Sequence, residues 1–104
     1  MHYILDLECD NLLDKVTKIH CIVIKDINTN EIFTDLNVCI KKIKNAKMLI
    51  GHNIIAFDIP VIEKILKFKP KAELFDTLVA CRLIYAHIKE IDFKLIHTDF
   101  PKNL

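Results

Sequence analysis

The chain has 104 residues, of which 52% are hydrophobic and 28% charged, and its formal net charge is +1. This length and composition indicate one small globular domain over residues 1–104, and they exclude a disordered or low-complexity chain. The near-neutral charge excludes a polycation that would coat nucleic acid without selectivity.

Cysteine usage and hydropathy favour a reduced, cytoplasmic protein. The four cysteines lie in apolar stretches without a C-x-x-C pair or zinc-type spacing, as expected for small hydrophobic side chains. Acidic residues interrupt the first apolar run, so we expect no signal peptide. No apolar run approaches the roughly eighteen residues that a membrane span requires.

The N-terminal half predicts a strand meander followed by a helix. Residues 2–7, 19–26 and 31–36 are rich in strand-forming side chains. The D-I-N-T-N segment between the last two runs predicts a tight turn, because Asn and Asp adopt turn conformations readily. Apolar residues alternate with lysines over 38–47, which predicts a short amphipathic helix.

The second half predicts two strand–helix units. Residues 48–50 form a strand that runs into G-H-N, which holds the single glycine of the chain. Pro60 fits only the first turn of a helix, so that helix begins near 57–59. Residues 74–75 predict a short strand, and Asp76 an N-cap for a helix over 77–87. This order indicates an α/β fold with a mixed sheet, whose first and fourth strands are parallel, central and largely buried.

Asp6 and Glu8 stand at the end of the first predicted strand. Two residues apart, they share one face of it, while Leu5 and Leu7 share the other. Paired carboxylates without a basic neighbour resist burial unless a cation lies between them or one is protonated. Oxygen ligands of this kind suit Mg²⁺ and Mn²⁺. The alternative is that the strand frays and both acids reach water.

Asp58 adds a third carboxylate at the same predicted edge of the sheet. It opens the helix that follows the fourth strand, and ligands commonly collect at the carboxyl ends of adjacent parallel strands. Alone, Asp58 is an ordinary first-turn residue matched to the helix dipole. Together the three acids favour a metal-dependent phosphodiester site, in which two ions activate water and stabilise the leaving oxygen.

Two lysine-rich segments account for much of the positive charge. Each is either a solvated surface or a guide for a nucleic-acid strand. The first contains Lys41, Lys42, Lys44 and Lys47, and the second Lys64, Lys67, Lys69 and Lys71.

Three segments, in order and spacing, resemble the exonuclease region of phage DNA polymerases related to bacterial DNA polymerase I (family A). D-L-E-C-D-N-L-L-D-K-V-T-K-I-H-C-I-V-I resembles their first exonuclease motif and G-H-N-I-I-A-F-D-I-P-V-I their second. F-D-T-L-V-A-C-R-L-I resembles the strand–helix segment that follows. The resemblance covers most of the chain and implies a ribonuclease H-like (DnaQ-like) fold. It also implies a proofreading 3′–5′ exonuclease of the bacterial or phage-infected cell, which removes nucleoside monophosphates from single-stranded DNA ends.

The resemblance assigns catalytic roles to the three acids. It implies that Asp6 bridges two Mg²⁺ or Mn²⁺ ions, that Glu8 binds the first ion, and that Asp58 holds the second mainly through water.

The resemblance also implies substrate contacts for four residues. Leu12 wedges beside the terminal base, Asn53 contacts the terminal nucleotide, and Phe57 lies against its sugar. His52, beside the site, is a candidate phosphate contact. Simpler alternatives are a core position for Leu12 and a helix cap for Asn53. Asp76 also matches a residue of the family, but the predicted N-cap role is sufficient to explain an aspartate at this position. The other histidines are expected to be structural or exposed: His2, His20, His87 and His97.

The family's third motif, a Tyr or His followed by a fourth metal-binding Asp, has no clear counterpart. His87 and Asp92 have an H-x4-D spacing but fall in the preceding helix, and the final F-P-K-N-L resembles the loop before the motif. We therefore expect a fold truncated at its C-terminus and an incomplete two-metal site. The chain is then part of a longer enzyme, a short form completed by self-association or by a polymerase domain or subunit, or an inactive module that binds nucleic acid or a polymerase. The choice between DNA and RNA stays open.

Overall fold

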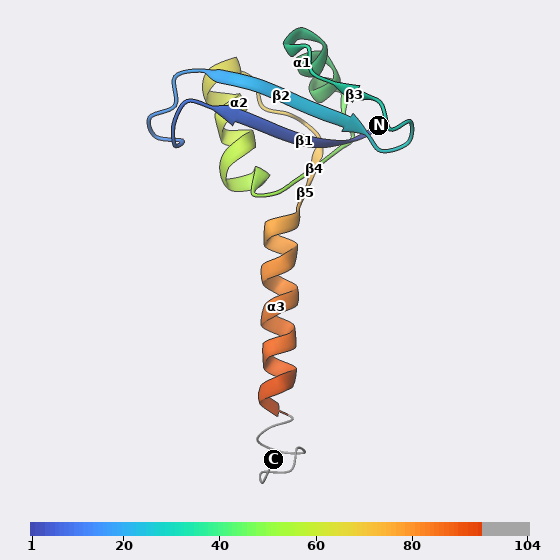
Figure 1. The fold of residues 1–104 in the computed structure, drawn as a ribbon, viewed down its shortest axis with the longest axis vertical. Coiled ribbons are helices and arrows are strands. Elements are labelled where there is room, and N and C mark those ends of the chain that lie inside the picture. Colours follow the sequence, from blue (N-terminus) through green and yellow to red (C-terminus); the bar gives the residue numbers. More distant parts are fainter. Residues whose placement is uncertain (95–104) are drawn as a thin grey trace.

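The computed structural model describes the backbone of residues 1–94 and the side chains of residues 1–91. Within that range the chain forms an α/β fold with a mixed five-stranded sheet and three α-helices (Figure 1). The elements are β1 (His2–Cys9), β2 (Ile19–Asp26), β3 (Ile32–Phe33), α1 (Leu36–Asn45), β4 (Met48–Gly51), η1 (Ile54–Asp58), α2 (Ile59–Leu66), β5 (Glu73–Asp76) and α3 (Thr77–Lys94).

The strand order is β3-β2-β1-β4-β5, so β1 lies at the centre of the sheet, as predicted. β1 is antiparallel to β2 and parallel to β4, and β4 is parallel to β5. The carboxyl ends of β1, β4 and β5 therefore share one edge of the sheet. This is the edge at which side chains from the three strands can act together.

The two faces of the sheet differ in burial. On one face Tyr3, Leu5 and Leu7 of β1 pack into a core shared with α1 and α2. On the other face Ile4 is 45% exposed and Phe75 is 50% exposed. The prediction that the central strands are largely buried is therefore wrong for this second face, which none of the described helices covers.

Gly51 is required where β4 passes β1. A Cβ atom at this position would lie 2.8 Å from the Leu5 carbonyl oxygen and would overlap the Ile54 side chain. The single glycine of the chain thus permits close contact between the two parallel strands and the segment that follows β4.

Several boundaries differ from those predicted. β1 continues to Cys9, so Glu8 lies within the strand. β3 has only two residues, because the Asp35 side chain accepts a hydrogen bond from the Val38 N–H and caps α1. A π-helical turn, η1, precedes α2 and was not expected. Pro60 lies in the first turn of α2, as predicted.

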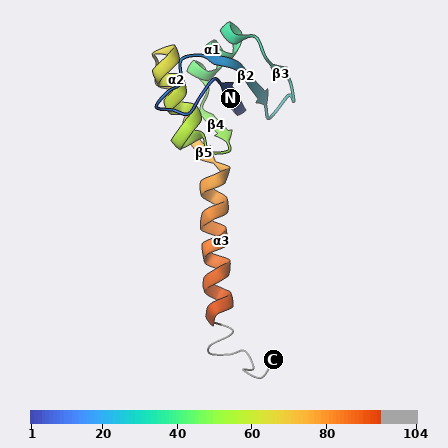
Figure 2. The same ribbon diagram turned by 60° about the vertical axis from the view of Figure 1, so that its left-hand side comes forward.

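Helix α3 extends away from the sheet (Figures 1 and 2). It continues well beyond the predicted end at residue 87, since no Gly or Pro interrupts residues 77–94. Its large apolar side chains are exposed on several sides: Val79, Leu83, Ile84, Tyr85, Ile88 and Ile91. Among the described helices, none is long and apolar enough to cross a membrane.

The cysteines differ in their surroundings. Cys39 is buried, where its Sγ lies 3.3 Å from the Phe33 carbonyl oxygen. Cys21 and Cys81 are exposed, so the expectation of apolar surroundings is wrong for them. All four thiols are free.

Candidate functional site

Asp6 and Glu8 lie on the open face of the sheet, near the carboxyl end of β1. Both acidic side chains are exposed, whereas Leu5, before Asp6, and Leu7, between the two acids, are buried. The predicted division between the two faces of the strand is therefore confirmed. On β2 their partners in the sheet are Val23 and Cys21, which carry no positive charge to offset the acids.

Asp58 is a buried carboxylate close to these two acids. It is 6% exposed and ends η1, immediately before α2. Burial, and then the negative charges of Asp6, Asp76 and Glu8, raise the pKa of Asp58 to about 7, against a hydrogen bond from the Leu7 backbone that lowers it. Its side chain makes no capping hydrogen bond to α2, so a helix-cap role does not explain its burial.

The chemistry of these donors fits a hard divalent cation. Asp6, Glu8 and Asp58 offer only carboxylate oxygens, and their mutual repulsion is what such a cation relieves. Over residues 1–91, however, no three Asp, Glu, His or Cys side chains lie close enough together to form a set of metal ligands. The acids are electrostatically coupled without forming that closer arrangement.

Asp76 organises the segment that carries Asn53. Its Oδ1 accepts hydrogen bonds from the Leu78 N–H at 2.9 Å and the Val79 N–H at 3.3 Å, which confirms the predicted N-cap of α3. It also accepts from the Asn53 N–H at 2.9 Å, and its Oδ2 accepts from the Ile55 N–H at 3.0 Å. Burial would raise the pKa of Asp76, but these donors lower it overall. The second pair of contacts joins residues more than twenty positions apart, and no local pattern predicts it.

The segment after β4 holds three candidate substrate residues. Asn53 occupies the N-cap position of η1, as the alternative of a helix cap predicted, but with left-handed backbone angles (φ 62°, ψ 30°) and no capping hydrogen bond from its side chain. The Phe57 ring is half-buried against the core, and its N–H donates to the Asn53 carbonyl at 3.1 Å. His52 is exposed, and its Nδ1 lies 3.0 Å from the Thr77 hydroxyl.

Leu12 is 70% exposed in the loop between β1 and β2, so the alternative that it is a core residue is wrong. Its neighbour Leu13 is half-buried against the core. The Lys64 ammonium of α2 donates to the Leu13 carbonyl at 2.9 Å and to the Asp14 carbonyl at 3.2 Å. Helix α2 thus holds the loop while leaving the Leu12 side chain free to contact a ligand.

Asp10 closes the base of the same loop. Its carboxylate accepts hydrogen bonds from the Thr17 N–H at 2.9 Å, from the Thr17 hydroxyl and from the Lys18 N–H at 3.2 Å. The Thr17 bonds are the main reason that the pKa of Asp10 lies well below its usual value. Asp10 is therefore a structural acid, unlike its neighbours Asp6 and Glu8.

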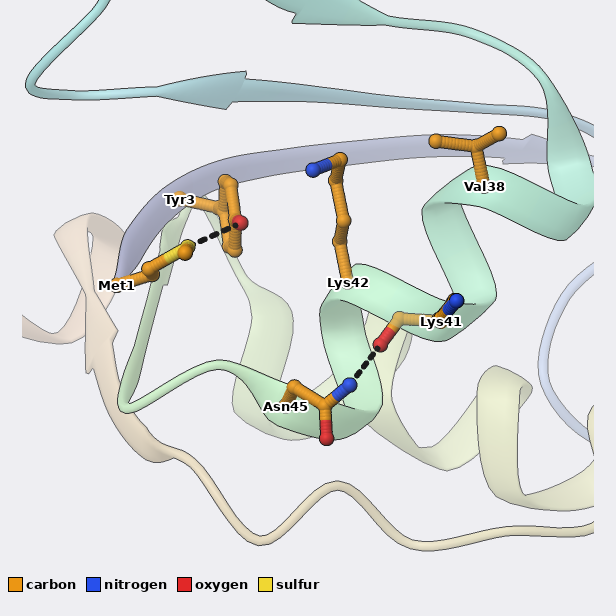
Figure 3. A pocket seen from close by; sticks show the side chains of 6 residues that line it. All are labelled: Met1, Tyr3, Val38, Lys41, Lys42 and Asn45. Atoms are coloured by element: carbon orange, nitrogen blue, oxygen red, sulfur yellow. Dashed lines mark hydrogen bonds between the residues drawn. The ribbon is translucent and has the colours of Figure 1, made fainter.

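A cavity of about 370 Å³ lies on the other side of the sheet (Figure 3). Its lining is Met1, Tyr3, Val38, Lys41, Lys42 and Asn45. The Tyr3 hydroxyl donates to the Met1 sulfur at 3.0 Å, and the Lys42 ammonium lies 4.3 Å from the Phe33 ring centroid. Tyr3 is on the β1 face opposite Asp6, so this cavity is separate from the acids.

The remaining predicted positions fall into two groups. His2, His20 and His87 are exposed, as predicted. His87 and Asp92 both lie within α3, as predicted. His97, the F-P-K-N-L segment and the Asp92 side chain lie outside the described residues.

Comparison with known proteins gives two phage relatives, whereas no family model matches the chain. The chain is 32% identical over 108 residues to a DNA-directed DNA polymerase of Enterobacteria phage T3 and 30% identical to that of Escherichia phage T7. Each match covers 89% of this chain but 15% of the polymerase. The chain is therefore related in sequence to a short segment of these phage DNA polymerases.

Proposed function

We propose that this chain is the acidic-site portion of a metal-dependent 3′–5′ exonuclease of the proofreading type, with a ribonuclease H-like (DnaQ-like) fold. The observation that carries the proposal is Asp58, a buried acid whose pKa is raised in part by Asp6 and Glu8. A stable fold has no need for a buried acid that other carboxylates repel, so a perturbed pKa of this kind is typical of a functional site. The central β1, antiparallel to β2 and parallel to β4, agrees with the proposed fold.

Asp6, Glu8 and Asp58 would hold Mg²⁺ or Mn²⁺ in this proposal. Bound divalent ions supply an activated water and stabilise the leaving oxygen in phosphodiester hydrolysis. Asp58, whose pKa is raised to about 7, would lose its proton when a cation binds.

The neighbouring residues would position a single-stranded DNA 3′ end. Leu12, exposed on an anchored loop, would contact the terminal base. Asn53 and Phe57, from the segment that Asp76 holds, would contact the terminal nucleotide and its sugar. His52 would contact a phosphate. The protein would act in the cytoplasm of a bacterial or phage-infected cell.

Nucleotide release from a 5′-labelled single strand tests the proposal. With Mn²⁺ or Mg²⁺ the wild-type protein should shorten the strand from its 3′ end, and Asp6→Ala should reduce the rate on the order of 100-fold or more. Glu73→Ala, which removes an exposed acid from β5, is the matched control and should retain the rate. Equal rates for the wild type and Asp6→Ala would contradict the proposal.

The alternative function is an incomplete exonuclease-like module that binds nucleic acid or a polymerase partner, or that is completed by self-association. The lack of a metal-ligand cluster in residues 1–91 favours it. Under this alternative the wild type would bind a single strand, yet neither metal would support release of nucleotides.

A further inference from the structure

We propose that Lys44, Lys69 and Lys71, arranged around Phe68, bind the phosphates of a single-stranded nucleic acid at a site separate from the acids. We call these four residues the Phe68 patch. They line a cavity of about 280 Å³ at the surface.

The Phe68 patch joins the two lysine-rich segments of the sequence. Lys44 lies in the last turn of α1, whereas Lys69 and Lys71 lie between α2 and β5. The fold brings Lys44 of the first segment beside Lys69 and Lys71 of the second, so cations that are distant in the sequence share one surface.

Local packing holds the patch in place. The Phe68 ring is half-buried against the core, and the Lys44 ammonium lies 4.9 Å from its centroid. This cation–π contact fixes the direction of Lys44 without neutralising its charge. Pro70 is buried, while Lys69 and Lys71 on either side of it are exposed. A buried residue with a fixed φ thus anchors the segment that presents both cations.

The charges of the patch favour an anionic ligand. Within the described residues no carboxylate pairs with Lys44, Lys69 or Lys71, although the chain as a whole is nearly neutral. Three ammonium groups around one cavity repel one another, and a phosphate between them would relieve that repulsion. Lysine binds phosphate as a point charge and needs no fixed geometry, which suits a flexible backbone.

Three cations drawn from two separate segments indicate a polynucleotide rather than a single phosphate. Proteins that bind single strands without sequence preference use a positively charged groove that follows the nucleic-acid backbone. Helix α2 begins next to Asp58 and ends next to the patch, a rise of about 12 Å for its eight residues. A strand of a few nucleotides spans such a distance. The patch therefore offers a second hold on a strand, whether or not the acids cleave it.

Binding of a 5′-fluorescein-labelled oligothymidylate, followed by anisotropy in EDTA, tests the proposal without any nuclease activity. The double variant Lys69→Gln/Lys71→Gln should lower the affinity about tenfold or more at about 50 mM salt. It should also reduce the slope of log affinity against log salt by about 1.4, since each lost phosphate contact contributes about 0.7. Lys41→Gln/Lys89→Gln makes the same charge change at exposed sites outside the patch and should bind nearly as the wild type does.

Further variants separate the patch from folding and from the acids. Both lysines are exposed, so the melting temperature of the patch variant should match that of the wild type. Lys69→Arg/Lys71→Arg should keep the affinity because it keeps both charges. Asp6→Ala should lose nucleotide release but still bind, which distinguishes this site from the proposed exonuclease site. Three results would each overturn the inference: no salt-dependent binding by the wild type, wild-type binding by the patch variant, or an equal loss in the Lys41/Lys89 control.

Discussion

At the scale of single residues, Asp58 connects the candidate site to the stability of the fold. The folded chain raises the pKa of Asp58 from its usual 3.8 to about 7, through burial first and then through Asp6, Asp76 and Glu8. Between these two pH values the folded state holds a proton on Asp58 that the unfolded state has lost. The stabilisation that the folded state gains from holding this proton on Asp58 is therefore complete below about pH 4, and it is lost as the pH rises to about 7.

We predict that the free energy of unfolding falls by about a few kcal/mol as the pH rises from about 4 to about 7 and levels off between about 7 and 8. At higher pH the raised pKa values of Cys39 and Tyr3 should lower it again. Asp10 and Asp76, whose pKa values are lowered, affect stability only on the acid side of this window. Asp58→Asn, which is neutral at every pH, should remove most of the decline. Urea titrations of the wild type and Asp58→Asn at several pH values between about 4 and 8 measure the free energy of unfolding of each protein. A wild-type profile that is flat or rising from pH 4 to 7 would contradict the prediction.

At the scale of elements, the Asp76 carboxylate joins three parts of the chain. It lies at the end of β5, caps α3, and accepts hydrogen bonds from the Asn53 and Ile55 N–H groups around the start of η1. Because the Asn53 backbone is left-handed and η1 is a π-helical turn, this segment departs from the regular geometry of an α-helix. One buried side chain therefore fixes the shape of the segment that leads to Asp58.

We predict that Asp76→Ala costs about 3 kcal/mol of stability, since it removes the acceptor for four N–H groups in a buried setting. Asp35→Ala is the matched control, because Asp35 caps α1 through the single Val38 N–H and its loss should cost about 1 kcal/mol. Urea unfolding of the two variants gives the comparison. If Asp76→Ala costs no more than Asp35→Ala, the bonds to Asn53 and Ile55 contribute little.

Helix α3 shows how an element can follow from local sequence while its surroundings do not. Its N-cap and first turns follow from Asp76 and from the absence of Gly and Pro. A helix with apolar side chains on several sides is typical of a buried helix. Here α3 instead leaves the sheet directly from β5, with Asp76 capping its first turn.

At the scale of the whole molecule, periodicity and capping residues predicted the elements of the fold, because these features act over a few neighbouring residues. The strand meander, the first-turn Pro60 and the shared face of Asp6 and Glu8 followed in this way. The long-range features did not follow. The bonds of Asp76 to Asn53 and the meeting of Lys44 with Lys69 depend on segments that only the tertiary fold brings together.

The repulsion between Asp58 and the acids Asp6 and Glu8 predicts how the stability of the whole fold should respond to divalent cations. At about pH 8, above the Asp58 pKa, Asp58 adds its negative charge beside Asp6 and Glu8, so a bound cation stabilises the folded state by mass action. With a dissociation constant near 1 mM, about 10 mM Mg²⁺ would add roughly 1.4 kcal/mol, or several degrees in melting temperature for a domain of this size. Differential scanning fluorimetry at matched ionic strength in NaCl measures the difference. The shift should be smaller at about pH 5, where Asp58 holds its proton, and absent in Asp6→Ala. An equal shift from NaCl alone would mean that the acids bind no divalent cation in the chain as it stands, because screening alone would then account for the stabilisation.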